Sequence, residues 1–169
     1  AGYGTTLRIA ERMGRNAVGI ELLGERCEHI SRVAPSSLVL QGDARDLARI
    51  VDPPFDLVLT SPPYMTSVGH PENPLTGYAT DDGDYPTYLR EVSAVFAQVA
   101  ALLRPGGQAV VNVANLVSAS PAGDVVTPLA WDVGRAVAQH LTLRGETFLC
   151  WDRHPPGHAG DYLLWFAKD

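Results

Sequence analysis

The chain has 169 residues, the size of one ordinary domain, with 46% hydrophobic and 19% charged residues. This balance supplies enough apolar side chains for a core, and it excludes disordered and fibrous proteins. The formal net charge of −6 disfavours a general nucleic-acid coat protein, which would be basic, but it is compatible with an enzyme that contacts nucleic acid through one local patch.

Predicted helices and strands alternate along most of the chain. Apolar residues spaced three to four apart predict helices at residues 7–13, 25–33, 44–50, 86–103 and 125–141. Short apolar runs predict strands at residues 17–21, 37–41, 55–60, 108–113, 142–151 and 162–167. Residues 65–84 and 115–123 show little periodicity and are predicted to be loops.

This alternation predicts an α/β fold with a mostly parallel, doubly wound sheet that is covered by helices on both faces. The last two strands are separated by too few residues for a helical crossover, so we expect them to pair antiparallel near one edge. The range 1–169 is expected to form a single domain. A glycine loop such as Gly2-Tyr3-Gly4 normally follows a strand, so the first strand is expected upstream of Ala1 unless the chain is rearranged.

Two glycines and two acidic residues stand where an adenosine-like ligand would bind in such a sheet. Gly2 and Gly4 precede the first predicted helix and would let a ligand approach the backbone. Leu7 occupies the place of the third glycine of a dinucleotide site, which disfavours a pyrophosphate ligand. Glu21 ends the next strand and could accept hydrogen bonds from both hydroxyls of a ribose. Asp43 follows the strand after that and could accept one from an adenine amino group.

The string Ser61-Pro62-Pro63-Tyr64 directly follows the clearest predicted strand. The two prolines fix two φ angles and remove two amide donors, which leaves a stiff turn rich in acceptors. The Ser61 hydroxyl and the Pro62 carbonyl could accept both hydrogens of a planar amine, while the Tyr64 ring stacks on its face. A proline-stiffened turn with a packed tyrosine is the alternative interpretation.

Together, these motifs resemble the S-adenosylmethionine-dependent amino methyltransferases of DNA, which methylate cytosine at N4 or adenine at N6. The resemblance covers essentially the whole chain, and it rests on residues 2–6, 19–21, 42–43, 60–64, 150–153 and 161–168. Tyr3 stands where the family usually has serine. The form with Ser61 in place of aspartate is commoner in the N4-cytosine group, so cytosine N4 is the favoured target.

The resemblance implies a Rossmann-like class I methyltransferase fold with S-adenosylmethionine as the cofactor. By this resemblance, the cofactor-binding residues are Gly2, Gly4, Thr5, Glu21, Asp43 and Ala44. The catalytic residues, which would hold a target base flipped out of the duplex, are Ser61, Pro62, Pro63 and Tyr64.

The expected chemistry is direct transfer of a methyl group to an amine. The exocyclic amine of cytosine or adenine is a poor nucleophile, because its lone pair is delocalised into the ring. Acceptors at Ser61 and Pro62 would favour a pyramidal nitrogen that attacks the sulfonium methyl in line, with no covalent enzyme intermediate. Methylation of cytosine at carbon 5 would need a cysteine nucleophile, typically after a proline, and neither Cys27 nor Cys150 follows one.

A large target-recognition region is the main family feature that the chain lacks. The candidate segments, residues 65–84, 115–124 and 154–160, are short and none is strongly basic. Recognition of nucleic acid, with DNA preferred over RNA, could therefore depend on a separate subunit, on a homodimer or on further sequence. Three other functions stay open: an N2-guanine methyltransferase of RNA, a protein glutamine methyltransferase, and a degenerate fold that serves as an interaction module.

The remaining residues of chemical interest are expected to have ordinary structural roles. His154 and His158 flank two prolines that prevent the helix needed to align two ligands, so no metal site is expected. Trp131, Trp151 and Trp165 lie on predicted helices and strands and are expected in the core. Two isolated cysteines and the lack of a long apolar run indicate a cytoplasmic chain that does not bind a membrane.

Overall fold

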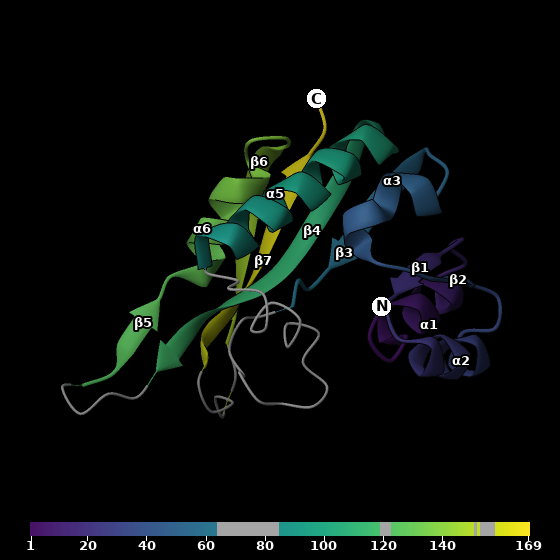
Figure 1. Ribbon diagram of the computed structural model, residues 1–169, viewed down its shortest axis with the longest axis horizontal. Coiled ribbons are helices and arrows are strands. Elements are labelled where there is room, and N and C mark those ends of the chain that lie inside the picture. The colour runs from purple at the N-terminus through teal and green to yellow at the C-terminus, as the bar shows by residue number, and fades with distance from the viewer. Residues whose placement is uncertain (64–84, 119–122, 151, 153–157) are drawn as a thin grey trace. The chain divides into compact units, whose positions relative to one another are not determined.

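In the computed structural model, the described residues are 1–63, 85–118, 123–150, 152 and 158–169 (Figure 1). They form two compact units, Ala1–Pro53 and Pro54–Asp169, each with its own sheet. Within these residues, no helix is long and apolar enough to cross a membrane. The loop predicted at residues 65–84 lies outside the described residues, as do Tyr64, Trp151 and His154.

The first unit is a small parallel sheet with helices packed on it. Its elements are α1 (Thr5–Arg12), β1 (Val18–Glu21), α2 (Gly24–Val33), β2 (Leu38–Gln41), a 3₁₀ turn (Ala44–Asp46) and α3 (Leu47–Ile50). β1 and β2 pair in parallel with Glu21 opposite Gln41, so the carboxyl ends of both strands lie at one edge. The buried side chains of Leu7, Ile30 and Ala34 form the core of this unit.

The second unit is a five-stranded mixed sheet. Its elements are β3 (Phe55–Thr60), α5 (Tyr85–Leu102), β4 (Leu103–Ser118), β5 (Val125–Thr127), α6 (Leu129–Val137), β6 (Thr142–Leu149) and β7 (His158–Ala167). The strand order is β3-β4-β7-β6, with β3 and β4 parallel and β7 antiparallel to both of its neighbours. The short β5 pairs with the end of β4, and the two extend together beyond the other strands (Figure 1). The predicted antiparallel pairing of the last two strands is confirmed.

Helices α5 and α6 cover one face of the five-stranded sheet (Figure 1). Val111 of β4 lies opposite Leu164 of β7, and both are buried together with Phe166. Phe96 of α5 and Val133 of α6 are buried as well. The core of the second unit therefore lies between this sheet face and the two helices.

The other face of the same sheet carries exposed hydrophobic side chains. Leu59, Val110 and Trp165 are in register across β3, β4 and β7, and Trp165 is 41% exposed. Trp131, near the start of α6, is 48% exposed. The expectation that Trp131 and Trp165 belong to the core is therefore wrong. Trp165 is exposed because, within this unit, α5 and α6 cover only the opposite face of the sheet. Trp131 is exposed because other residues of α6, such as Val133, occupy the buried side of that helix.

Asn115 joins β4 to α6. The sequence pattern predicts a loop from this residue, but β4 continues to Ser118 through a bulge between Ala114 and Leu116. Asn115 is buried at the bulge, and its Oδ1 accepts a hydrogen bond of 2.8 Å from the backbone nitrogen of Ala130. The side chain thus satisfies an amide in the first turn of α6 that has no partner within the helix.

The predicted helix over residues 125–141 begins later than expected. Val125–Thr127 is a strand, because its β-branched side chains suit a pleated ladder and β4 offers the partner. Pro128 precedes α6, which starts at Leu129. The other predicted helices and strands are present, with β4 and β7 longer than predicted.

Candidate functional site

The glycine loop of the first unit turns through two left-handed residues. Gly2 and Gly4 have φ angles of 60° and 78°, a conformation that side chains rarely adopt. The Gly4 nitrogen closes the loop with a hydrogen bond of 3.2 Å to the Ala1 carbonyl. Gly4 is also tightly packed, since a Cβ there would lie 3.0 Å from Ile30. The loop leads into α1, whose first residue, Thr5, is exposed.

The carboxylate of Glu21 holds this loop against the end of β1. Its Oε2 accepts hydrogen bonds of 2.8 Å from the nitrogens of Ala1 and Gly2, and its Oε1 accepts one of 3.2 Å from Leu23. Glu21 is only 7% exposed. A carboxylate has about four acceptor positions, so these contacts leave one on Oε1. That position can accept a further donor such as a hydroxyl.

Glu21 has a pKa below its ordinary value of 4.5, although it is buried. Burial raises the pKa, whereas hydrogen bonds from the backbone nitrogens of Ala1, Leu23 and Gly2 lower it by more. Glu21 is therefore ionised at neutral pH, as an acceptor for ligand hydroxyls should be.

Asp43 lies just beyond the carboxyl end of β2, and Arg45, two residues further along the chain, binds its carboxylate. The carboxylate accepts hydrogen bonds of 2.8 Å from the Arg45 backbone nitrogen and of 3.0 and 2.7 Å from its Nε and Nη2. These contacts lower the pKa of Asp43. Ala44 follows as the first residue of the 3₁₀ turn. A ligand amino group at Asp43 would therefore share the carboxylate with Arg45.

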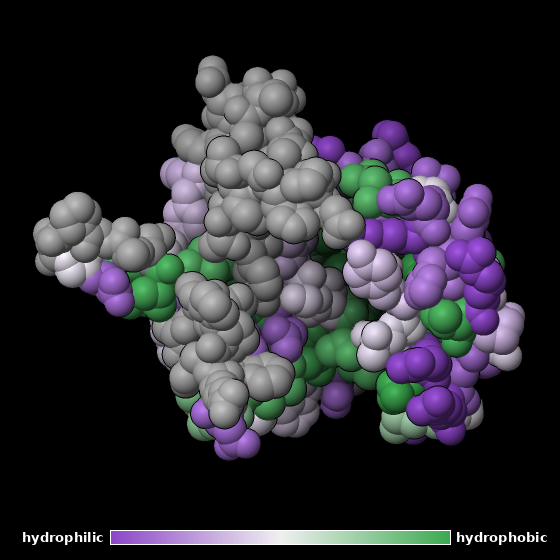
Figure 2. All heavy atoms as spheres, turned by 90° about the horizontal axis from the view of Figure 1, so that it is seen from below, coloured by the Kyte–Doolittle hydropathy of each residue, from purple (hydrophilic) through white to green (hydrophobic). Residues whose placement is uncertain are grey.

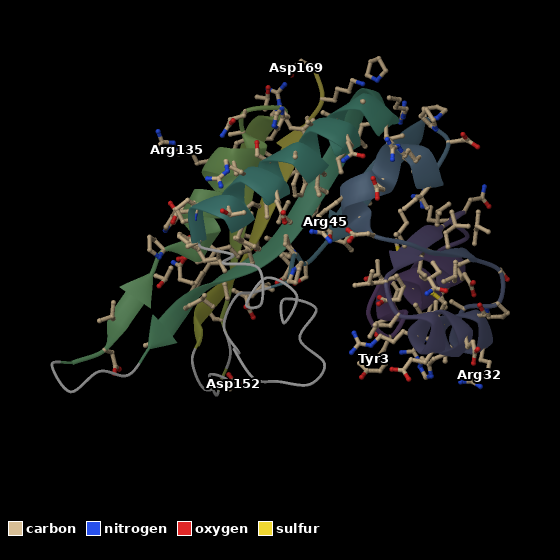
Figure 3. All side chains as sticks on the ribbon, viewed as in Figure 1. Tyr3, Arg32, Arg45, Arg135, Asp152 and Asp169 are labelled. Atoms are coloured by element: carbon tan, nitrogen blue, oxygen red, sulfur yellow. The ribbon has the colours of Figure 1, made fainter. Side chains whose placement is uncertain are left out.

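Tyr3, at the position where the resembled family usually has serine, packs beside α2 (Figure 3). The Arg26 guanidinium carbon lies 5.0 Å from the centroid of the Tyr3 ring. The His29 ring meets Tyr3 edge-on, with 5.9 Å between centroids. These contacts with two residues of α2 hold the exposed tyrosine ring to one side of the loop.

The Ser-Pro-Pro corner belongs to the second unit. It directly follows β3, whose last residue, Thr60, lies opposite Val111 of the parallel strand β4. Ser61 and Pro63 are exposed, whereas Pro62 is buried. The corner therefore stands at the carboxyl edge of the five-stranded sheet, which is where open α/β sheets bind ligands. Tyr64 lies outside the described residues.

Two polar pairs near α5 and α6 were missed by the sequence analysis. The Tyr85 hydroxyl donates a hydrogen bond of 2.7 Å to Asp132, and Ser93 Oγ lies 2.9 Å from His140 Nε2. Burial, followed by the hydrogen bond to Asp132, raises the pKa of Tyr85 well above its ordinary value. The partners of each pair are 47 residues apart in the chain, so no local motif marks them.

Comparison with known proteins places this geometry in a fold class. No family model matches the chain, and no curated protein matches it. TrmN from Thermus thermophilus is 17% identical with a TM-score of 0.63, over 96% of this chain and 40% of that protein. A second protein from Thermus thermophilus, provisionally named a DNA modification methylase and complexed with S-adenosyl-L-methionine, is 28% identical with a TM-score of 0.54. That match covers 75% of this chain and 51% of the Thermus methylase.

A TehB-like S-adenosylmethionine-dependent methyltransferase from Corynebacterium glutamicum is also similar, with 18% identity and a TM-score of 0.59 over 99% of this chain and 76% of that protein. The chain therefore has the Rossmann-like fold of class I S-adenosylmethionine-dependent methyltransferases, as the sequence predicts. It spans two fifths of TrmN and about half of the Thermus methylase.

Proposed function

We propose that the chain is the catalytic domain of an S-adenosylmethionine-dependent methyltransferase that acts on the exocyclic amino group of a DNA base, with cytosine N4 as the first choice. The observation that carries the proposal is the Ser61-Pro62 corner at the carboxyl end of β3. The similarity to the Thermus methylase, at 28% identity, supports a nucleic-acid substrate. In this proposal both units belong to one catalytic domain.

The first unit would bind the cofactor. Gly2 and Gly4 let a ligand approach the backbone, and the remaining acceptor of Glu21 suits a hydroxyl of the ribose. Asp43 would accept a hydrogen bond from the adenine amino group beside Arg45. When bound, S-adenosylmethionine supplies a methyl group that its sulfonium activates for transfer. The first residues of α1 and of the 3₁₀ turn complete the proposed set: Thr5 and Ala44.

The corner in the second unit would prepare the amine for attack. Ser61 Oγ and the Pro62 carbonyl accept its two hydrogens, which favours a pyramidal nitrogen with a localised lone pair. The carbon–nitrogen bond forms as the carbon–sulfur bond breaks, and the nitrogen then releases one proton. Pro63 stiffens the turn. Tyr64, outside the described residues, is proposed to stack on the base.

Recognition of the target sequence is proposed to come from outside the chain, through a separate subunit or a homodimer. The segments 65–84, 115–124 and 154–160 are too short to form a sizeable recognition region. RNA is the second candidate substrate, because N2-guanine methyltransferases of RNA resemble this chain in their Pro-Pro-Tyr turn.

Transfer of tritium from labelled S-adenosylmethionine to pools of DNA and RNA, followed by nucleoside analysis, tests the proposal with the full-length protein. We expect label in N4-methyl-2′-deoxycytidine. Label in an RNA nucleoside would move the substrate to RNA. Failure both to transfer label and to bind S-adenosylmethionine by calorimetry would overturn the enzyme proposal and favour an interaction module.

A further inference from the structure

We propose that Trp131, Phe148 and Tyr162 form an aromatic platform that stacks one unpaired base of the nucleic-acid substrate, a neighbour of the base that is methylated. The inference rests on the proposed function, since it concerns the same substrate, and adds a second contact region to it. The three rings come from α6, β6 and β7 of the second unit.

The Tyr162 ring packs against both of the other rings, and Trp131 and Phe148 are open to solvent. The Tyr162 ring centroid lies 5.3 Å from that of Trp131 and 4.9 Å from that of Phe148, with an interplanar angle of 59° in both pairs. Trp131 is 48% and Phe148 46% exposed. Contiguous exposed aromatic surface marks interaction sites, and unpaired nucleobases stack on such rings irrespective of sequence.

The fold makes room for the Phe148 ring at one position of β7. Gly160 has a φ of 141°, and a Cβ there would lie 2.3 Å from Cζ of Phe148. Because only glycine fits, the ring lies directly against the β7 backbone on one side. The Phe148 ring is held on one side by the β7 backbone and is nearly half exposed, so a nucleobase could stack on it.

The strand register places the platform at the same sheet edge as the proposed catalytic corner. Tyr162 lies opposite Val113 of β4 on one side and opposite Phe148 on the other. Val111, two residues before Val113 on β4, pairs with Thr60, the last residue of β3. Ser61 directly follows Thr60, so the corner and the platform lie at the same end of the strands. Two strand spacings, about 10 Å, separate β3 from β7. Figure 2 views the molecule from the side toward which β4 runs; tryptophan and tyrosine are slightly hydrophilic on the scale used there, so the green surface does not mark Trp131 or Tyr162.

Arg135, close to the platform, suits a phosphate of such a strand. Arg135 lies one helical turn after Trp131 on the same side of α6, and it extends away from the helix (Figure 3). With Arg90 of α5, it lines a groove of about 330 Å³ between the two helices. Asp132 in the same groove is engaged by Tyr85, at 2.7 Å. A base stacked on Trp131 could therefore direct a flanking phosphate toward Arg135.

Fluorescence anisotropy with labelled (dC)12, the matching (C)12 RNA and a DNA duplex tests the platform in the full-length protein. We expect Trp131→Ala and Phe148→Ala each to weaken binding of single strands on the order of tenfold. Trp131→Phe should restore most of the affinity, because it keeps a ring. The matched control is Trp165→Ala, which removes a similarly exposed tryptophan from the other sheet face and should bind normally.

Salt dependence separates stacking from charge. Arg135→Ala should reduce the slope of log affinity against log salt by about 0.7, whereas Trp131→Ala should leave the slope unchanged. Binding by Trp131→Ala and Phe148→Ala equal to that of Trp165→Ala would overturn the platform, and continued methyl transfer by these variants would leave the proposed function intact. If binding depended on Trp131 but the protein had no transferase activity, the platform would stand and the proposed function would be overturned. A wild-type protein that binds none of the three nucleic acids would overturn the platform.

Discussion

The carboxylate of Glu21 accepts a hydrogen bond of 2.8 Å from the backbone nitrogen of Gly2, nineteen residues earlier in the chain. One acid at the end of β1 therefore fixes the glycine loop and keeps an acceptor position for a ligand. The conformation of the loop, the affinity for a ligand and the stability of the first unit should consequently depend on the same side chain.

Glu21→Ala should weaken binding of S-adenosylmethionine roughly 10- to 100-fold, because a charge-assisted acceptor is lost and the loop amides lose their partner. Isothermal titration calorimetry measures the change. Glu25→Ala, at an exposed position in the first turn of α2, is the matched control and should bind normally. Equal affinity of both variants would mean that Glu21 does not contact the cofactor.

Glu21 should also make the first unit sensitive to acid. Its pKa in the folded state is lower than the ordinary value of 4.5, so its contribution to stability is present above that value and is lost as the pH falls through the folded pKa. Urea unfolding at pH values from about 6 down to 3 should show a loss of stability that Glu21→Gln reduces. Identical pH profiles of the two proteins would contradict this account.

Gly4 combines two restrictions that can be separated by comparison with Gly14. Both residues have positive φ angles, 78° and 67°, but a Cβ at Gly14 would meet no atom within 4 Å, whereas one at Gly4 would lie 3.0 Å from Ile30. Gly14→Ala should cost about 1 kcal/mol of unfolding free energy from backbone strain alone. Gly4→Ala should lower the free energy of unfolding by more than Gly14→Ala, as measured by urea titration of both variants. Equal losses would show that Ile30 moves aside without a cost in stability.

Asn115→Ala should destabilise the second unit by about 1–3 kcal/mol, because the buried Ala130 amide loses its acceptor. Thermal unfolding followed by circular dichroism measures the loss. Asn115→Asp keeps an acceptor oxygen at the amino end of α6 and should lose less than the alanine variant. A larger loss for aspartate would indicate that burial of its charge outweighs the capping contact.

Local patterns predicted those parts of the fold that depend on neighbouring residues. The mainly apolar run Phe55–Thr60 became β3 with its predicted bounds, although Leu57 and Leu59 are exposed in it. Gly2 and Gly4 adopt the left-handed conformations that glycine permits. The fold class followed from the alternation of strands and helices.

The remaining features depend on contacts that are distant in sequence. Val125–Thr127 is a strand because the end of β4 pairs with it, and Asn115 lies at a bulge of β4, where its side chain reaches α6. Trp131 appeared to belong to the core because tryptophan on a helix usually does, and its exposed position depends on which side of α6 faces the sheet. Arg45 and Asp43 are close in sequence, but the sequence does not show that the Arg45 guanidinium occupies part of the Asp43 carboxylate, the proposed acceptor for adenine.

The most direct test of the account is a comparison of methyl transfer with cofactor affinity in Ser61→Ala. If the corner accepts hydrogens of the target amine, transfer of tritium to nucleic acid should fall about 100-fold, by analogy with the removal of one preorganised polar contact. Calorimetric affinity for S-adenosylmethionine should stay within about twofold of the wild-type value, because the proposed cofactor contacts lie in other residues. Unchanged transfer, or a parallel loss of transfer and cofactor affinity, would contradict the assignment of Ser61.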